Sequence, residues 1–353
     1  AAVGAVLAVL VVASLAITKA SPMFVSLPEV FSCYALAASQ LVNGIVNPAQ
    51  VLSFDDILAA HPLYYHILAN AGRVLIYVVC GVLLALAGAL YQNVFRNPIA
   101  SPAMLGVSSG IQLGVAVLVL VFGTAAADML AGRYAVCYLV VAIVLAVLFA
   151  CSALMSGKGR PINVVNMLVV GTIINQLVGV IVSYLTWYAL QDELLDVYLY
   201  LTTYVVPVSN AVSWAILAVA VLVGAVPIFA LRFRLNLLGF GPQDMKVMGV
   251  SSVRLQLLAL VCGSIMMITA QLQVGAVAMV TLVVPHISRA LFGAEFSKQF
   301  AGNLLLGAAV LVACYLIASA IPYNGDIPLG TVVNLVVLPA FVWIIATQQR
   351  KWD

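Results

Sequence analysis

The sequence predicts an all-α integral membrane protein, a polytopic bundle of about ten transmembrane helices that forms a single domain over residues 1–353. Composition is the first observation behind this prediction: 65% of the residues are hydrophobic and 7% are charged, whereas soluble proteins carry about 25% charged residues. Length is the second, because a single soluble core stops growing beyond roughly 250–300 residues, so this much apolar sequence has to contact lipid. The net charge of +3 gives no indication of a nucleic-acid partner.

Ten apolar stretches approach the length of about 20 residues that a membrane-spanning helix needs. In chain order they cover residues 2–18, 74–92, 103–122, 134–155, 164–190, 211–231, 253–272, 274–292, 301–321 and 327–346. Residues 30–46 are less apolar and include Ser32, Ser39, Gln40 and Asn43. Each polar group buried in lipid costs free energy, so we expect an interfacial or extramembrane helix there. An alternative with eleven spans, in which residues 30–46 enter the membrane, stays open.

The basic residues orient the predicted spans, since Lys and Arg collect in cytoplasmic loops. With both termini in the cytoplasm, only three of the 14 basic residues lie outside, namely Lys19, Arg73 and Arg133. We therefore expect an external segment at about residues 19–72 and a long cytoplasmic loop at about residues 232–252. An eleventh span would move only the amino terminus to the outside.

Several kinds of functional residue are missing from the sequence. No Asp, Glu, His or Arg lies in the middle of a predicted span, where ion-coupled carriers place such a group. The G-x-x-x-x-G-K-[ST] loop of an ATPase and the motifs of intramembrane hydrolases are absent, and the six cysteines include no CxxC pair. We expect no catalytic residue and no metal site. The protein therefore needs a nucleotide-hydrolysing partner, or it moves solute passively.

The most informative stretch, residues 86–110, reads LAGALYQNVFRNPIASPAMLGVSSG. It predicts a span that ends at an inside-facing Arg-Asn-Pro corner, because proline stops one helix and prepares the next turn. The next helix is expected to open with Gly106, Gly110 and Gly114, a GxxxGxxxG row that lets two helices approach closely in lipid. Helix packing alone accounts for these glycines.

Residues 86–110 resemble the FecCD-type (BtuC-like) permeases of ABC importers, which carry iron-siderophore, haem or cobalamin. LVVPHISR at residues 282–289 and DIPLG at residues 326–330 are similar to two further motifs of that family. The resemblance implies a type II ABC importer permease in the bacterial inner membrane. Its implied partners are two cytoplasmic ABC ATPase subunits, a second permease subunit and a periplasmic substrate-binding protein. A homodimer is preferred over a heterodimer. ATP and Mg are expected on the ATPase partners, and no covalently bound cofactor is expected.

The cytoplasmic loop at residues 232–252, called the coupling segment below, resembles the family pattern G-x-x-x-A-x-x-L-G-V. Gln243 to Met248 are expected to form a short helix with Pro242 at its first position, where proline is well tolerated. The resemblance implies that this segment docks on the ATPase through Phe240, Gln243, Asp244, Lys246, Val247, Met248 and Gly249. Lys246 stands where the pattern usually has Ala, and Met248 where it has Leu. Without the resemblance, the segment is a basic loop that only fixes topology.

The fifth predicted span carries a polar stripe. Thr172, Gln176, Gly179 and Ser183 recur at helical spacing and share one face, and Asn175 lies near them. From the residues alone, hydrogen bonding to a neighbouring helix is the simpler interpretation. In the family the corresponding helix lines the central pathway at the subunit interface. The resemblance therefore implies that these five residues line the translocation path.

Arg73 precedes the second predicted span and matches the second Arg of the family's R-L-P-R element, whose first Arg is replaced here by Asn70. The resemblance implies contact with glutamates of the binding protein. An ordinary snorkelling arginine at the membrane interface explains Arg73 equally well.

The sequence as a whole predicts the permease subunit of an ATP-driven importer that moves a metal chelate from periplasm to cytoplasm by alternating access. Iron-siderophore is the preferred cargo, and haem and cobalamin are alternatives. The main alternative function is a passive channel or an uncoupled carrier.

Overall fold

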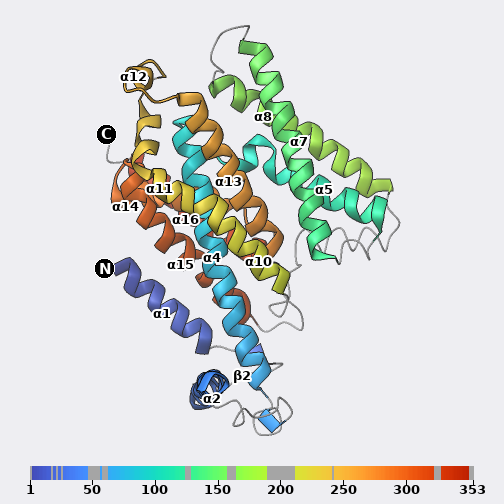
Figure 1. Ribbon diagram of the computed structural model, residues 1–353, viewed down its shortest axis with the longest axis vertical. Coiled ribbons are helices and arrows are strands. Elements are labelled where there is room, and N and C mark those ends of the chain that lie inside the picture. The colour runs from blue at the N-terminus through green and yellow to red at the C-terminus, as the bar shows by residue number, and fades with distance from the viewer. Residues whose placement is uncertain are drawn as a thin grey trace.

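The computed structural model describes residues 2–16, 19–20, 23–24, 27–46, 56–57, 63–123, 129–156, 164–188, 211–240, 242–321 and 327–349. Within these residues, six helices are long and apolar enough to cross a membrane, and four shorter apolar helices accompany them. Together they coincide with the ten predicted spans. Figure 1 shows them packed side by side into an elongated helical bundle. The predicted fold class is confirmed.

The helices before the middle of the chain are α1 (Ala2–Ala16), α2 (Leu27–Val46), α4 (Tyr64–Phe95), α5 (Val107–Phe122), α7 (Leu130–Ser156) and α8 (Val164–Tyr188). Those after it are α10 (Ala211–Ala220), α11 (Val226–Leu235), α12 (Pro242–Val247), α13 (Ser252–Val274), α14 (Met279–Phe292), α15 (Phe296–Ala320) and α16 (Leu329–Gln349). Short helices of other types are the 3-10 helices η2 (Pro102–Leu105) and η4 (Asn236–Gly239) and the π-helix η3 (Val221–Ala225). Two strands, β1 (Lys19–Ala20) and β2 (Met23–Phe24), pair antiparallel with Lys19 opposite Phe24.

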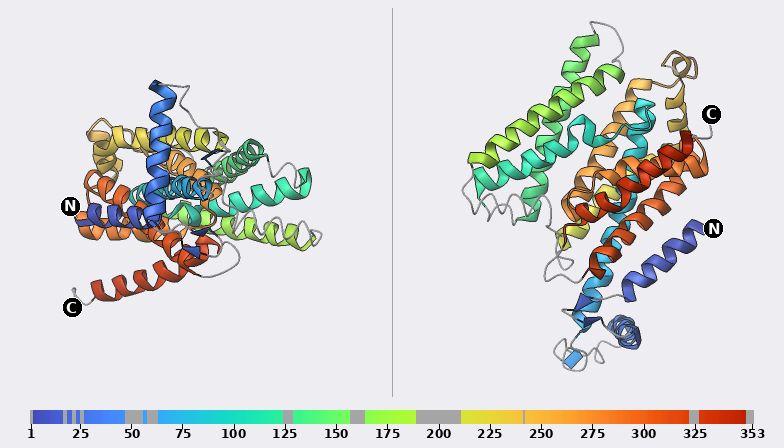
Figure 2. Two further views of the ribbon diagram at one scale, coloured as in Figure 1. Left: turned by 90° about the horizontal axis from the view of Figure 1, so that it is seen from below. Right: turned by 180° about the vertical axis from the view of Figure 1, so that it is seen from behind.

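Helix α4 forms the centre of the bundle and packs against α13, α14 and α15. Its 32 residues correspond to about 48 Å at 1.5 Å per residue, which exceeds the roughly 30 Å of a bilayer's hydrocarbon core. Gly81 of α4 faces Gly307 of α15 so closely that a Cβ on either would collide with the other's carbonyl oxygen. Small residues at this crossing therefore let the two backbones touch, as in other membrane bundles. On the rear of the bundle, α1 lies beside α15 (Figure 2).

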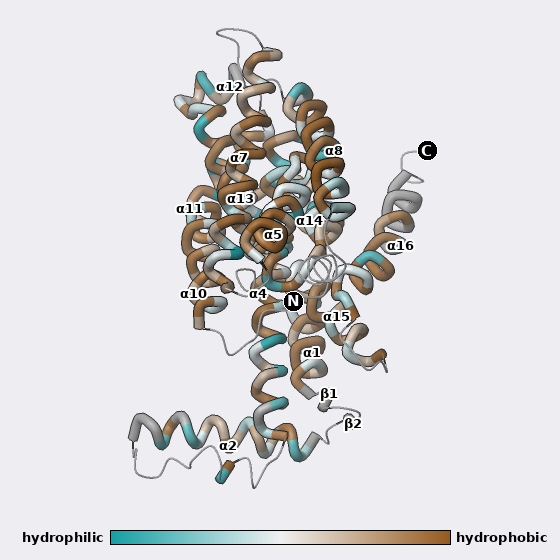
Figure 3. Tube along the Cα trace, turned by 90° about the vertical axis from the view of Figure 1, so that its right-hand side faces the viewer, coloured by the Kyte–Doolittle hydropathy of each residue, from teal (hydrophilic) through white to brown (hydrophobic). Residues whose placement is uncertain are grey.

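Helix α2 lies across one end of the bundle, at a steep angle to α4 (Figure 3). It is not among the candidate membrane spans found in the described residues. Its buried side chains Val30 and Cys33 form a small apolar cluster with Ile57, Tyr64 and Ile67, separate from the main core. That α2 is an interfacial or extramembrane helix stays a prediction.

The structure corrects three predicted boundaries. The third span starts as η2, and Gly106 then caps α5 with a φ of +87° instead of opening the helix. The eighth span begins at Met279 rather than at residue 274, because Gly275 ends α13 with a φ of +84°. The sixth span is interrupted by η3 and continues as α11 to Leu235. Glycines and a π-helical stretch end or interrupt these helices inside sequence that stays apolar, so hydropathy alone does not locate them.

Candidate functional site

The coupling segment contains a short, well-terminated helix. As expected, Pro242 is the first residue of α12. At the other end the N–H of Val250 donates to the carbonyl of Met245 over 3.0 Å, and the N–H of Gly249 donates to the carbonyl of Lys246 over 3.1 Å. These two bonds form a Schellman motif, which requires a left-handed residue; Gly249 supplies it with a φ of +73°. Glycine at this position therefore fixes where α12 ends.

Two side chains at the end of α4, one in its last turn and one on the residue that caps it, hold the stretch that precedes α12. The guanidinium of Arg96 donates from Nε to the carbonyl of Leu238 over 2.9 Å and from Nη2 to the carbonyl of Phe240. Asn93 donates from Nδ2 to the carbonyl of Leu235 over 2.8 Å. Since all three acceptors are backbone carbonyls, α4 positions the course of the chain into α12 independently of the side chains there.

A second pair of bonds joins the coupling segment to the start of α15. The backbone N–H of Ser297 donates to Oδ1 of Asn236 over 3.1 Å, and Nδ2 of Asn236 donates to Oγ of Ser297 over 3.1 Å. The coupling segment is thus tied to two central helices, α4 and α15. A force applied to α12 acts on the core of the bundle through these bonds.

Helix α12 lies at the end of the bundle opposite α2 (Figure 1). The coupling segment exposes apolar side chains there. Val247 is 89% exposed, and Met248 and Phe240 are about half exposed at 51% and 50%. Asp244, Lys246 and Gly249 are exposed as well, and Gln243 lies within α12. Apolar side chains exposed together on and beside a short helix are typical of a protein-binding surface.

The polar stripe lies on the exposed side of α8. Thr172, Gln176 and Ser183 are exposed, Asn175 is half-buried, and a Cβ added at Gly179 would meet nothing within 4 Å. The opposite side of α8 packs against α5 and α7. The hydroxyls of Thr172 and Ser183 donate to carbonyls of their own helix over 2.8 and 2.9 Å, and within the described residues none bonds a neighbouring helix. The stripe is therefore open to a cargo or to a second subunit.

The glycine row of α5 lies against α7. A Cβ at Gly110 would stand 3.0 Å from Val141, and one at Gly114 would stand 2.9 Å from the Cα of Cys137. Gly106, at the cap, is similarly close to Val144 at 2.9 Å. The row brings α5 and α7 into backbone contact and fixes which side of α5 faces away from α7.

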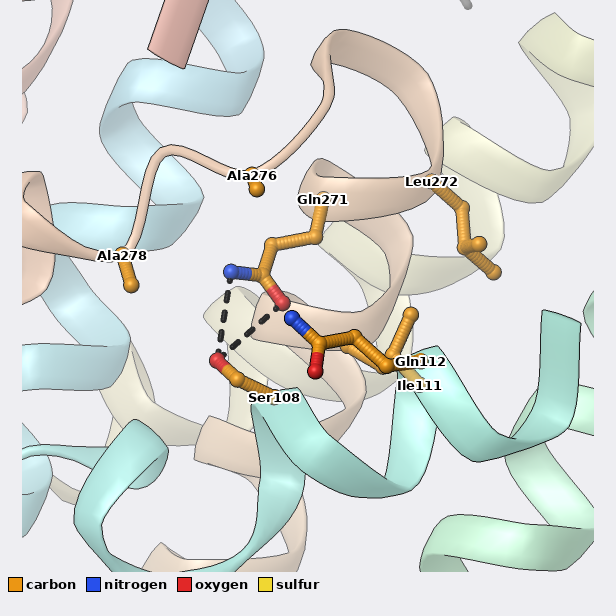
Figure 4. A pocket seen from close by; sticks show the side chains of 7 residues that line it. All are labelled: Ser108, Ile111, Gln112, Gln271, Leu272, Ala276 and Ala278. Carbon is orange, nitrogen blue, oxygen red and sulfur yellow. Dashed lines mark hydrogen bonds between the residues drawn. The ribbon is translucent and has the colours of Figure 1, made fainter. Parts of the chain in front are cut away.

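That far side of α5 lines a small hollow. Ser108 and Gln112 lie two residues to either side of Gly110, about 160° around the helix from it. With Gln271 of α13 and the α13–α14 corner they enclose about 100 Å³ (Figure 4). Gln271 is 7% exposed, and among the described residues its amide bonds the hydroxyl of Ser108, over 3.3 and 3.4 Å. The hollow thus offers uncharged hydrogen-bonding groups. Sequence reasoning missed this hollow, because Ser108 and Gln271 are 163 positions apart in the chain.

At the α2 end of the bundle, Arg73 and Asn70 have different roles. Arg73 is exposed, whereas Asn70 is 4% exposed. Asn70 donates from Nδ2 to the carbonyl of Ser14 over 2.8 Å and accepts at Oδ1 from the hydroxyl of Tyr315. It therefore joins α4 to α1 and α15. Only Arg73 lies where a docking partner could reach it.

The comparisons with known proteins agree with this architecture. Residues 46–347 match the model of the FecCD transport family. The chain belongs to this family. It is 30% identical over 293 residues to the uncharacterized ABC transporter permease protein YvrB of Bacillus subtilis, covering 82% of this chain and 81% of that protein. It is 29% identical over 283 residues to the hemin transport system permease protein HmuU of Yersinia pestis, covering 79% of this chain and 82% of that protein.

Other similarities are more local or more distant. A Helicobacter pylori protein named "Probable iron chelatin transport system permease protein" is 35% identical over 123 residues, which span 35% of this chain and 37% of that protein. Among solved structures, an inward-facing transporter assigned to the metal-chelate ABC type has a TM-score of 0.70 at 22% identity, covering 89% of this chain and 98% of that one. At that identity the likeness shows the fold, which is that of type II ABC importer permeases. The resemblance drawn from the three sequence motifs is confirmed.

Proposed function

We propose that this FecCD-family chain is the transmembrane permease subunit of an ABC importer that moves a metal chelate from periplasm to cytoplasm by alternating access. Iron-siderophore is the preferred cargo, with haem or cobalamin as alternatives. Relatives named for Fe(3+) dicitrate, hemin and vitamin B12 transport support this cargo class. The chain itself acts as a transport subunit, not as an enzyme, and resides in the bacterial inner membrane with both termini in the cytoplasm.

The observation that carries the proposal is the construction of the coupling segment. Its apolar side chains Val247 and Met248 are exposed. Arg96 holds its backbone to the end of α4, and Asn236 joins it to the start of α15. Such a segment suits a partner that pushes on the bundle from outside it. We assign that role to two cytoplasmic ABC ATPase subunits, which carry ATP and Mg.

The exposed polar stripe of α8 supports a path at the interface with a second permease subunit, preferably a second copy of this chain. Thr172, Gln176 and Ser183 offer neutral hydrogen-bonding groups to this interface. Neutral groups bind a polar cargo weakly, so the cargo can leave when the path opens to the other side. Recognition is then left to a periplasmic substrate-binding protein.

Binding of the purified ATPase subunit to the reconstituted permease tests the proposal. Val247→Asp places a charge in the apolar contact and should weaken ATPase binding roughly tenfold or more, about 1.4 kcal/mol. The fold should persist, because the side chain is 89% exposed. Val42→Asp changes an exposed apolar residue of α2, at the other end of the bundle, and serves as the matched control.

A passive channel or an uncoupled carrier predicts a different result. If Val247→Asp binds the ATPase as tightly as the unaltered chain, the coupling assignment is wrong. Uphill transport by the purified chain without any ATPase would refute the importer function as a whole.

A further inference from the structure

A groove of about 500 Å³ lies beside the coupling segment, between the end of α11 and the start of α13. The chain from Met248 to Ser251 forms one wall. Helices α11 and α13 form the others, through Leu231 and Arg234 on one side and Arg254, Leu255 and Leu258 on the other. Met248 and Gly249 also belong to the proposed ATPase contact, whereas the side chains from α11 and α13 have no part in the proposed transport cycle.

The groove carries an uncompensated positive charge. Arg234 and Arg254 are both exposed, and within the described ranges the one ion pair joins Lys298 to Glu295, so neither arginine has an acidic partner there. Ser251, which also lines the groove, is the N-cap of α13. The partial positive charge of this helix end adds to that of the two guanidinium groups. An anion is the ligand that this end of the groove favours.

The rest of the groove is apolar and lies at the edge of the predicted bilayer. Leu231, Leu255 and Leu258 line it, at the end of one candidate span and the beginning of the next. The neighbouring surface exposes Phe233 and Leu257, which are 64% and 39% accessible. Leu255 is already buried, whereas Leu231 and Leu258 are partly exposed, and a free phosphate leaves these two side chains uncovered. A phospholipid covers them with an acyl chain while its headgroup meets the arginines.

We propose that this groove binds an anionic phospholipid, with the phosphate between Arg234 and Arg254 and an acyl chain along the leucines. Basic pockets between transmembrane helices near the cytoplasmic surface are suited to such headgroups. Because the chain from Met248 to Ser251 forms a wall of the groove, the bound lipid stabilises the position of the coupling segment. This regulatory consequence rests on the proposed function, whereas the binding of the lipid does not.

Lipid retention by the purified full-length chain tests the binding. Native mass spectrometry in detergent, with phosphatidylglycerol and phosphatidylcholine as probes, should show preferential retention of phosphatidylglycerol. Arg234→Gln and Arg254→Gln should each weaken its retention about fivefold, and the double variant about twentyfold or more. Inorganic phosphate at millimolar concentration should not displace the lipid.

Arg232→Gln is the matched control, because it removes the same charge from the same helix. Its guanidinium donates to the carbonyl of Phe229 over 2.8 Å and lies 4.1 and 4.5 Å from the ring centres of Phe229 and Phe233. Retention by this variant should match that of the unaltered chain. An equal loss in all three single variants would overturn the proposal, since it would indicate a general charge effect.

Three further outcomes would also overturn the lipid assignment. These are equal retention of both lipids, displacement by inorganic phosphate, and weaker binding of the ATPase by the Arg234 and Arg254 variants with unchanged lipid retention. The last would assign the groove to the ATPase.

The regulatory consequence is tested in vesicles with the assembled transporter. Phosphatidylglycerol should raise cargo-stimulated ATP hydrolysis above the level in phosphatidylcholine alone, and the double variant should lose this increase. Equal rates in both vesicle types would refute the effect on coupling. If the chain couples to no ATPase at all, the proposed function fails while lipid retention is still measurable, so the two failures are distinguishable.

Discussion

Arg96 and Leu238 lie 142 positions apart in the sequence, yet Nε of Arg96 donates a 2.9 Å hydrogen bond to the carbonyl oxygen of Leu238. Arg96 has a left-handed backbone with a φ of 47°, which among the described residues no other non-glycine residue adopts. The same residue therefore ends α4 and directs the chain that leads into α12. It connects the end of the central helix directly to the proposed ATPase contact.

Arg96→Gly should separate coupling from folding. A left-handed backbone costs other residues roughly 1–2 kcal/mol of conformational free energy but costs glycine little, so the end of α4 should persist. The lost bonds from a charged donor contribute about 1.5–3 kcal/mol each, so cargo-stimulated ATP hydrolysis in proteoliposomes should fall at least about tenfold. Asn93→Ala removes the neighbouring anchor and should have a smaller effect in the same direction. Full coupling in Arg96→Gly would contradict the anchoring role.

Two glycines of α8 give a matched test of the translocation path. Gly179→Leu should block transport and leave the thermal stability of the chain unchanged, because a Cβ there meets nothing within 4 Å in the chain itself. Gly171→Leu should instead destabilise the fold, since a Cβ there would stand 2.6 Å from Cδ2 and 3.1 Å from Cα of Leu105. Uptake assays and thermal unfolding of both variants distinguish the two effects. Normal uptake in Gly179→Leu would remove the stripe from the path.

Arg73→Glu should slow docking of the periplasmic binding protein. Charge pairs at an interface mainly steer the encounter, so the association rate should fall about tenfold at low salt while the dissociation rate changes less. The effect should shrink at high salt, because salt screens exposed charges. Stopped-flow mixing measures both rates, and Lys298→Glu, at the coupling end, is the control. An unchanged association rate would leave Arg73 as a snorkelling residue.

Cys33 should be an unreactive thiol. Its side chain is fully buried, and burial raises the pKa of the thiol above its ordinary value, with the charge of Glu29 adding to the effect. A raised pKa lowers the thiolate fraction at neutral pH, and the thiolate is the reactive form. Maleimide labelling at pH 7.5 should therefore be about tenfold slower or more at Cys33 than at Val42→Cys, with labelled peptides identified by mass spectrometry.

The same labelling experiment tests the position of α2. Val42 is 58% exposed, so a membrane-impermeant maleimide should reach Val42→Cys from outside intact cells if α2 lies outside the bilayer. Labelling only after detergent treatment would favour the eleven-span alternative.

The spans of this FecCD-family protein were predictable because hydropathy is a property of each segment by itself. The short helix after Pro242 was predictable for a similar reason, since proline and the following residues act locally. The ends at Gly106 and Gly275 were misplaced, because each depends on one backbone angle within apolar sequence. Local patterns fixed the elements to within a few residues.

Contacts between distant parts of the chain were not predictable from these patterns. The bonds of Asn236 with Ser297 join two elements that nothing in their sequences connects. Asn70, interpreted as a lost docking arginine, is buried between three helices. Arg234 and Arg254 counted only as inside-facing charges until the fold placed them in one groove. Each of these roles depends on which helices become neighbours.

Helix α4 contains no proline and no break between Tyr64 and Phe95. Arg73 lies in its first half and Arg96 follows its last residue, so one continuous helix runs from the α2 end of the bundle to the coupling segment. Because α4 has no hinge, a tilt imposed at one end of the helix appears at the other end. The close crossing of α4 and α15 at Gly81 and Gly307 is the point about which α4 would tilt. Docking of cargo at one end and ATP hydrolysis at the other would then both act on the tilt of α4.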